Sequence, residues 1–363
     1  MDSEPGSGSQ SNTGQSDHPG DHSRSPPQSQ SHGTTISTLP HEIIMDILSR
    51  LPTPSLFRAH EFHPPFGAVM PDFDLVGSSE GLLCLANALP SHDVYVYNPL
   101  TGEYREFPDL EGHQRTLKIV FGFGFDETEK DYKVIKIVYP IKNPKQIWVR
   151  DHLAYSEAQV CSLRSPTWRK LGNSQHSCNI LEATPSQPLV NNRLHWTTLK
   201  SKYWSVGIIS FDLSDEQFKD VPTPKYMHFL AGWCTLTELG GCLSTIVLSK
   251  SGALEIWVMK EYGMEESWIM DYIIGSYLPK NLHNPNDEFN NRSCKDSRIL
   301  KRGNFRINVR VLVMLRNGEI LLEYHNRVLV RYDPNHDKAV NLMLEGLPKW
   351  FQSIVHVSNI SRM

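Results

Sequence analysis

The stretch Val94–Pro108, VYVYNPLTGEYREFP, decides the fold. Two short runs of β-branched and aromatic residues flank a turn that contains Asn98, Pro99 and Gly102. Such runs are typical of strands, and these turn residues favour a tight connection between them. The second strand opens on an aromatic residue, Tyr104. The predicted unit is therefore a strand, a polar turn and an aromatic strand.

This unit recurs four more times along the chain. In the next three copies the second strand opens on or beside Trp168, Phe218 or Trp268, whereas the last copy has no aromatic residue there. The copies occupy Ala158–Leu171, Ile208–Pro222, Leu254–Met270 and Val328–Leu344. Apolar runs that predict further strands precede most copies, at Gly81–Leu85, Ile119–Phe125, Val134–Tyr139, Arg193–Trp196, Gly241–Leu248 and in the hairpin Val309–Tyr324.

The spacing of the copies distinguishes between the all-β architectures. An irregular recurrence of roughly 45–75 residues suits propeller blades of three to four strands with variable loops better than a sandwich. We therefore predict an all-β propeller of five or six blades over residues 76–358, with an incomplete ring as the alternative. The polar stretch Pro279–Asn308 has little apolar content, which predicts a long loop.

The chain before this domain has a different composition. Residues 1–36 are rich in Ser, Gly, Gln, Pro, Asp and His and nearly lack apolar residues, so we expect a disordered N-terminal tail. Residues 37–58 contain an apolar stripe at helical spacing. Residues 59–75 are rich in Pro and His without periodicity, which predicts a linker.

The stripe predicts a short helix that ends at Pro52. Its apolar residues are Ile43, Ile44, Ile47, Leu48 and Leu51. Pro40 stands where an early helical proline is tolerated, because its missing N–H would have no partner there anyway. An isolated helix of about three turns is marginally stable in water, so it must pack on something. Two interpretations stay open: a docking helix for a partner protein and an ordinary core helix.

Composition argues against several classes of protein. The net charge of −4 over 363 residues, with no basic stripe, does not indicate binding to nucleic acid. The six cysteines have no C-x-x-C spacing, which argues against a zinc module and against a disulfide scaffold. No apolar run approaches the roughly 20 residues of a membrane helix, and no hydrophobic signal region is visible. We expect an intracellular protein of the cytoplasm, the nucleus or both, with no metal or cofactor.

Two stretches could carry chemistry, and each also has a structural explanation. Phe121–Asp126, FGFGFD, contains G-x-G but lacks the third glycine and the following helix of a nucleotide loop. We interpret its glycines as points where two backbones approach closely. The second stretch is an acidic cluster, which we interpret as a solvated turn and not as a pair of catalytic carboxylates or a calcium site. It consists of Asp126, Glu127, Glu129 and Asp131.

The remaining candidates are aromatic residues and one histidine. Tyr104, Trp168, Phe218 and Trp268 recur at one place in the repeat, so we expect them to pack between blades and not to stack on a ligand. His195 lies in a predicted strand and is expected to be a core histidine with satisfied hydrogen bonds. The sequence has no G-x-S-x-G, P-loop or H-E-x-x-H motif. We therefore predict no catalytic residue.

The N-terminal helix belongs to a longer pattern. LPHEIIMDILSRLPTPSL, Leu39–Leu56, resembles the first half of an F-box, as found in plant F-box proteins. The second half of that pattern, a basic segment with Cys and Trp, does not follow, because Arg58 is succeeded at once by AHEFHPPFGAVMPDFDLVG. The resemblance covers about half an F-box and implies an internal deletion relative to the family.

The β domain extends the resemblance. Six motifs in the right order resemble the F-box-associated domain of plant F-box proteins, and they cover nearly all of Val76–Val330. They are VGSSEGLLCL (Val76–Leu85), YNPLTGEYREFP (Tyr97–Pro108), FGFGFDETEKDYKVIKI (Phe121–Ile137), LHW (Leu194–Trp196), ISFDLSDEQFKDVP (Ile209–Pro222) and EIWVMKEYGMEESW (Glu255–Trp268). This resemblance implies a kelch-like β-propeller that holds a target protein. The missing N-terminal sequence implies a ring with an unpaired edge.

The resemblance also implies a function. The chain would be the substrate-recognition subunit of an SCF-type ubiquitin ligase, with no catalysis of its own, no nucleic acid and no membrane. Its F-box helix would bind a Skp-family adaptor and through it a cullin, and its propeller would bind a target protein. The adaptor-binding residues would be Leu39, Pro40, Ile43, Ile44, Ile47, Leu48, Leu51 and Pro52. The alternatives are a stand-alone protein-binding propeller, in which the helix caps the domain, and an enzyme with a site in the central channel.

Overall fold

A computed structural model describes twelve segments of the chain. They are residues 73–87, 93–107, 116–140, 156–172, 179–180, 187–200, 205–225, 234–249, 253–275, 309–324, 327–342 and 353–357. The chain divides into two compact units, Met1–Leu56 and Phe57–Met363, and every described residue belongs to the second unit. The predicted tail, the partial F-box and the loop Pro279–Asn308 therefore lie outside the described residues.

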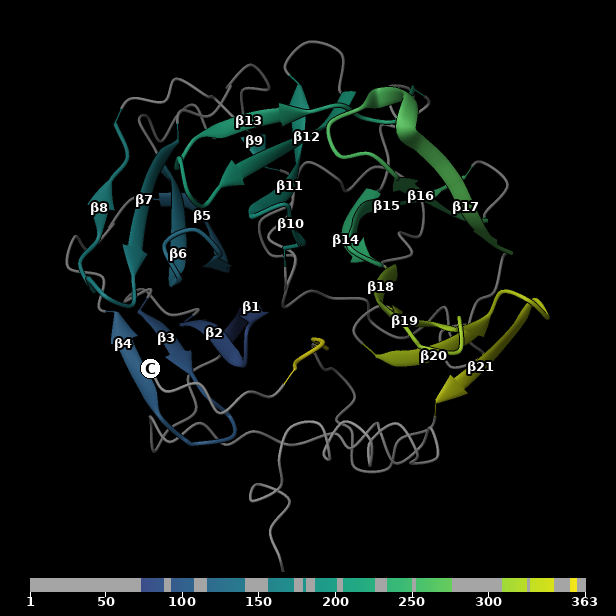
Figure 1. Cartoon of the computed structure of the whole chain (residues 1–363), viewed down its shortest axis with the longest axis horizontal. Coiled ribbons are helices and arrows are strands. Elements are labelled where there is room, and N and C mark those ends of the chain that lie inside the picture. Colours follow the sequence, from purple (N-terminus) through teal and green to yellow (C-terminus); the bar gives the residue numbers. More distant parts are fainter. Residues whose placement is uncertain are drawn as a thin grey trace, which may run out of the picture. The chain divides into compact units, whose positions relative to one another are not determined.

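The described part of the chain is built from five antiparallel sheets, which we name A to E in chain order (Figure 1). Sheet A contains β1 (Phe73–Ser79), β2 (Leu82–Asn87), β3 (Val94–Tyr97) and β4 (Tyr104–Phe107). Sheet B contains β5 (Thr116–Asp126), β6 (Asp131–Pro140), β7 (Glu157–Ser162) and β8 (Arg169–Lys170). Sheet C contains β9 (Asn179–Ile180), β10 (Leu189–Val190), β11 (Arg193–Lys200), β12 (Ser205–Asp212) and β13 (Phe218–Val221).

The last two sheets repeat this plan. Sheet D contains β14 (Cys234–Leu239), β15 (Cys242–Leu248), β16 (Leu254–Met259) and β17 (Trp268–Ile274), with a short 3-10 helix, η4 (Glu265–Ser267), before β17. Sheet E contains β18 (Val309–Met314), β19 (Ile320–Tyr324), β20 (Val328–Asp333) and β21 (Lys338–Leu342). In each sheet consecutive strands pair, apart from β9, which pairs with β11.

This arrangement is a five-bladed β-propeller, and it confirms the all-β prediction (Figure 1). Inner strands of neighbouring sheets contact each other: β1 contacts β5, and β14 contacts β18, while β11 of sheet C contacts both β5 and β14. The five predicted copies of the unit are the outer hairpins of the five sheets, β3–β4, β7–β8, β12–β13, β16–β17 and β20–β21. Sheet A begins at Phe73, three residues before the predicted start of the domain.

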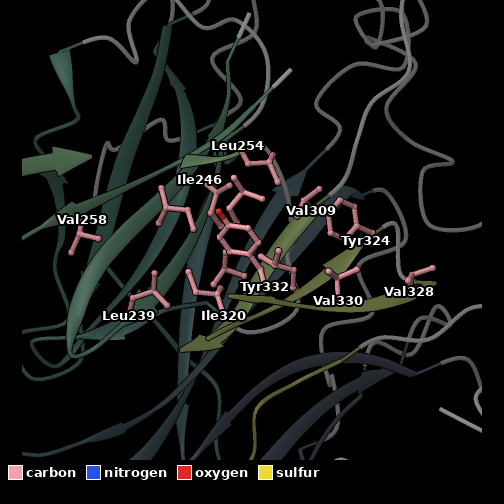
Figure 2. Close-up of a cluster of buried hydrophobic side chains, with 14 residues drawn as sticks. Leu239, Ile246, Leu254, Val258, Val309, Ile320, Tyr324, Val328, Val330 and Tyr332 are labelled. Carbon is pink, nitrogen blue, oxygen red and sulfur yellow. The ribbon is translucent and has the colours of Figure 1, made fainter. Parts of the chain in front are cut away.

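Four apolar clusters hold consecutive sheets together, because each sheet alternates buried side chains between its two faces. We call the boundary between two neighbouring sheets a seam. Side chains such as Val96 of sheet A and Val134 of sheet B share one cluster, and Trp196 of sheet C joins sheet B in another. Trp268 of sheet D joins sheet C. Figure 2 shows the cluster between sheets D and E, with Leu239 and Ile246 on one side and Tyr332 among the residues on the other.

The seam between sheets B and C requires glycine at Gly122. A Cβ atom built there would lie 2.6 Å from Cζ2 of Trp196, which is closer than real side-chain atoms come. At Gly124 a Cβ atom would lie 3.0 Å from Cδ1 of Leu213. The FGFGFD glycines therefore mark a close approach, but the prediction that two backbones meet there is wrong, because the nearest atoms belong to side chains of sheet C.

Candidate functional site

The eight predicted adaptor-binding residues lie outside the described residues, so their role stays a prediction. They are Leu39, Pro40, Ile43, Ile44, Ile47, Leu48, Leu51 and Pro52. Candidate sites in the described part of the chain are the turns of the propeller, the polar groups at its seams and the segment that follows sheet E.

The tight turns of all five sheets lie on one rim of the propeller, because consecutive antiparallel strands bring their hairpin turns to the same side. These turns are residues 80–81, 98–103, 127–130, 163–168, 191–192, 213–217, 240–241, 260–267, 315–319 and 334–337. They contain eleven acidic and four basic residues, which leaves a net charge of −7, whereas the whole chain carries −4. This rim therefore has a negative potential that favours cationic partners over anionic ones.

A buried lysine joins sheets B and C at this rim. Lys133 lies on β6, with only 3% of its side chain exposed. Its Nζ lies 3.0 Å from Oδ2 of Asp126, 2.8 Å from Oε2 of Glu129 and 3.4 Å from Oε1 of Glu216. It also donates a hydrogen bond of 2.6 Å to the carbonyl of Leu213 in sheet C. Burial alone would lower the pKa of Lys133, but the carboxylates raise it, so the amine stays charged.

Asp126 is the central carboxylate of this network. Burial would raise its pKa, but hydrogen bonds from Asn192, Lys133 and Ser214 hold the pKa at about 2. Asn192 Nδ2 donates to Asp126 Oδ1 at 2.9 Å, and Ser214 Oγ donates at 3.0 Å. The predicted solvated turn is therefore wrong for Asp126, which is fully buried, and for Asp131, which is 6% exposed. Asp126 is therefore an ionised structural group and does not share a proton for acid–base chemistry.

His195 links sheets C and D, and it is the buried core histidine that the sequence predicts. Its Nδ1 lies 3.1 Å from the carbonyl of Pro188, which can only accept a hydrogen bond, so Nδ1 carries the proton. Its Nε2 then accepts a hydrogen bond from the hydroxyl of Tyr262 at 2.7 Å. Burial lowers the pKa of His195 to about 4. Both ring nitrogens are engaged, so the ring is not placed to serve as a general base.

Other groups in the described segments do not gather into a reactive site. Among these residues, no three His, Cys, Asp or Glu side chains are grouped to hold a metal ion. Cys84 and Cys161 are buried, and burial raises the pKa of both thiols, which makes them poor nucleophiles. No helix in the described part of the chain is long and apolar enough to cross a membrane.

The seam between sheets A and E differs from the other four. In the described residues no apolar cluster joins these two sheets. A short segment, Ser353–Val357, lies there instead, and we call it the strap; Figure 1 shows it in yellow. At one end the backbone N–H of Ser353 donates to Oε2 of Glu323 at 2.8 Å, and Nη2 of Arg310 donates to the carbonyl of Ser353 at 3.2 Å. At the other end His356 Nδ1 lies 2.9 Å from Oγ of Ser78 on β1.

The burial of the four recurring aromatic side chains depends on the seam that each one faces. Phe218 and Trp268 are buried, 5% and 6% exposed, and Trp168 packs partly buried against the cluster between sheets A and B. Each of these three faces the preceding sheet. Tyr104 of sheet A pairs with Tyr97, which in turn pairs with Leu83, and neither belongs to the cluster with sheet B. Tyr104 therefore lies on the face toward the seam with sheet E. It is 46% exposed, so the prediction of a packed aromatic residue is wrong at Tyr104.

Comparisons with known proteins identify the relatives of this chain. The profile of the family described as "F-box associated beta propeller domain" matches residues 59–352. The chain is 40% identical over 317 residues to the F-box protein At3g07870 of Arabidopsis thaliana, covering 84% of this chain and 74% of that protein. It is 30% identical over 199 residues to the F-box/kelch-repeat protein At3g23880 of the same plant, covering 54% of this chain and 51% of that protein. Among solved structures, the Dos1 propeller aligns with a TM-score of 0.38 and 9% identity over 76% of this chain and 60% of its own.

Proposed function

The chain belongs to the F-box associated β-propeller family, and on that premise we propose that it is a substrate-recognition subunit of an SCF-type ubiquitin ligase. The family match over residues 59–352 carries this proposal. In it the propeller binds a target protein, the helix of residues 37–58 binds a Skp-family adaptor, and the adaptor connects to a cullin. The protein itself performs no catalysis, and it works in the cytoplasm, the nucleus or both.

Two features support a binding role over an enzymatic one. The buried titratable groups described above are satisfied by their neighbours: Lys133 has carboxylate partners, and His195 has hydrogen bonds on both nitrogens. The tight-turn rim offers a charged surface of short turns, and binding proteins commonly use such loops on a rigid scaffold. The adaptor contact follows the mode in which an amphipathic helix lays its apolar face into a groove.

Adaptor binding tests the proposal. We expect Ile47→Asp or Leu48→Asp to abolish co-purification with a plant Skp adaptor, because each places a charge in the apolar stripe. Ser49→Asp is the matched control, since it adds the same charge outside the stripe and should leave binding unchanged. The propeller should unfold at the same denaturant concentration in all variants. If both stripe variants still co-purify with the adaptor, the adaptor proposal is wrong.

A second candidate is a stand-alone protein-binding propeller that does not join the ligase. It is favoured by one observation, that the F-box pattern stops at Leu56 and lacks its basic second half. A version of the chain with an intact F-box distinguishes the candidates. If both versions bind the adaptor, the ligase proposal holds for this chain; if only the repaired version binds, this chain is the stand-alone form.

A further inference from the structure

We propose that the strap, Ser353–Val357, is a releasable closing segment of the propeller, which holds sheets A and E together and can detach without unfolding the other four seams. This inference concerns the ring itself and does not depend on the ligase proposal. It rests on the faces of the two sheets, on the atoms that hold the strap and on the small amount of strap surface that is buried.

The sheet E end of the strap is held by a buried ion pair. Arg310 and Glu323 are cross-strand partners on β18 and β19, and their side chains are 11% and 0% exposed. Their strand neighbours Val309, Leu322 and Tyr324 belong to the cluster with sheet D. Because side chains alternate along a strand, the pair lies on the opposite face, toward the seam with sheet A.

The ion pair binds the main chain of the strap. Glu323 accepts from the N–H of Ser353, and Arg310 donates to the carbonyl of the same residue. One guanidinium and one carboxylate therefore satisfy both backbone groups of a single residue. Hydrogen bonds to charged groups are stronger than neutral ones, and a desolvated pair strengthens them further. This end is the firmer of the two.

Within the described residues, one side-chain hydrogen bond joins the strap to sheet A. Ser78 pairs with Leu83, which is on the face of sheet A away from sheet B, so its hydroxyl faces the seam. His356 Nδ1 meets that hydroxyl at 2.9 Å. From Ser353 to His356 an extended chain can span about 10 Å, which matches the usual spacing of packed sheets. The strap therefore has the length needed to bridge the seam.

The strap is weakly anchored in comparison with the sheets it joins. None of its five residues is buried, and Val355 and Val357 are 43% and 63% exposed. The strap belongs to no strand in the described residues. The clusters at the other seams each contain at least six buried apolar side chains, whereas those that face this seam are buried but form no shared cluster across it. They are Leu83, Tyr97, Leu321 and Leu329. Local opening free energies follow buried contacts, so the strap should open before the rest of the propeller.

Amide hydrogen exchange on the full chain tests the proposal. In the unaltered protein, amides of the strap should exchange more slowly than in an unstructured peptide and faster than those of β11. We expect Ser78→Ala to raise exchange in the strap about fivefold, the effect of losing one ordinary hydrogen bond, with no change in β11 or β12. His356→Ala should act in the same way, while Val357→Ala should not.

The neighbouring serine gives a matched control. Ser79 points to the other face of sheet A, where its hydroxyl accepts a hydrogen bond from the N–H of Phe125 in sheet B. Ser79→Ala should therefore leave exchange in the strap unchanged. The proposal is overturned if strap and β11 exchange at one common rate, since the strap would then open only on global unfolding. It is also overturned if the strap exchanges like a free peptide, or if Ser79→Ala acts on it as strongly as Ser78→Ala.

Discussion

The seam between sheets B and C and the seam between sheets A and E join blades of one kind by different means. At the first, Trp196 and its apolar neighbours fill the space, and Lys133 adds a buried ionic network. At the second, the strap contributes three hydrogen bonds, and the buried side chains that face the seam belong to no shared cluster. These buried side chains are Leu83 and Tyr97 of sheet A and Leu321 and Leu329 of sheet E. Sheets B and C are consecutive in the chain, whereas A and E are its first and last sheets. In a repeat protein, each inner repeat is covered on both faces by its neighbours. The outer faces of the first and last repeats must be covered in another way.

The largest effect is expected from breaking the packed seam. Trp196→Ala should lower the free energy of unfolding by about 3–5 kcal/mol, because the indole is 2% exposed and packs under Gly122. Urea denaturation followed by circular dichroism measures the change. A loss below about 1 kcal/mol would show that the seam collapses around the cavity and is less rigidly packed than its geometry indicates.

The ionic part of the same seam comes next. Lys133→Met should cost about 3 kcal/mol, because the substitution keeps the volume and leaves Asp126 buried and unpaired with a cation. The cost stays at the low end of the usual range, since Glu216 keeps its ion pair with Arg169. Lys130→Met is the control, because its side chain is 65% exposed and its ion pair with Glu127 should contribute less than about 1 kcal/mol. Equal losses in the two variants would contradict the network's role.

Acid should weaken the seam between sheets C and D. The pKa of His195 is about 4 in the folded protein, below the ordinary value of 6.5, so its contribution to stability is fully present above pH 6.5. That contribution is lost as the pH falls toward 4, and the loss between pH 8 and pH 5 should be about 2 kcal/mol. His195→Asn removes the titration, and its unfolding free energy should change less over this range. Parallel pH profiles of the two proteins would exclude His195 as the cause.

The smallest effect is expected at the seam between sheets A and E. Tyr104→Ala should cost less than about 1 kcal/mol, because almost half of this side chain is exposed. Phe218→Ala, at the equivalent position of sheet C, should cost about 3–5 kcal/mol. Comparing the two denaturation curves tests whether the packing of the seam, and not the type of residue, decides how much unfolding free energy is lost. A comparable loss at Tyr104 would mean that the two seams are equally packed.

The regular part of the fold could be predicted from the sequence. Strand runs such as Val94–Tyr97 and Leu254–Met259 carry their own pattern, and the turns between them use residues with clear backbone preferences. The close approach at Gly122 and the buried state of His195 also followed from local sequence. These features depend on a few neighbouring residues, which is why a single sequence contains them.

The long-range features could not be predicted in this way. Asp126 looks like a turn acid beside Glu127 and Glu129, and only the folded chain brings Asn192 and Ser214 to it. Tyr104 matches the other aromatic residues in its repeat, but its neighbouring seam differs. The adaptor-binding stripe remains a prediction from resemblance. In each case the missing information is which segment, far along the chain, covers the residue.

The position of the strap in the chain has a consequence for synthesis. Ser78 and His356 are separated by 278 residues, so the first sheet leaves the ribosome long before the strap that contacts its outer face. At 5–20 residues per second, that interval is roughly 15–55 seconds. During this time sheets A to E can dock in order, each on its predecessor, while the outer face of sheet A still lacks the strap. Among the described sheet faces, this one would need shielding by a nascent-chain chaperone for the longest time.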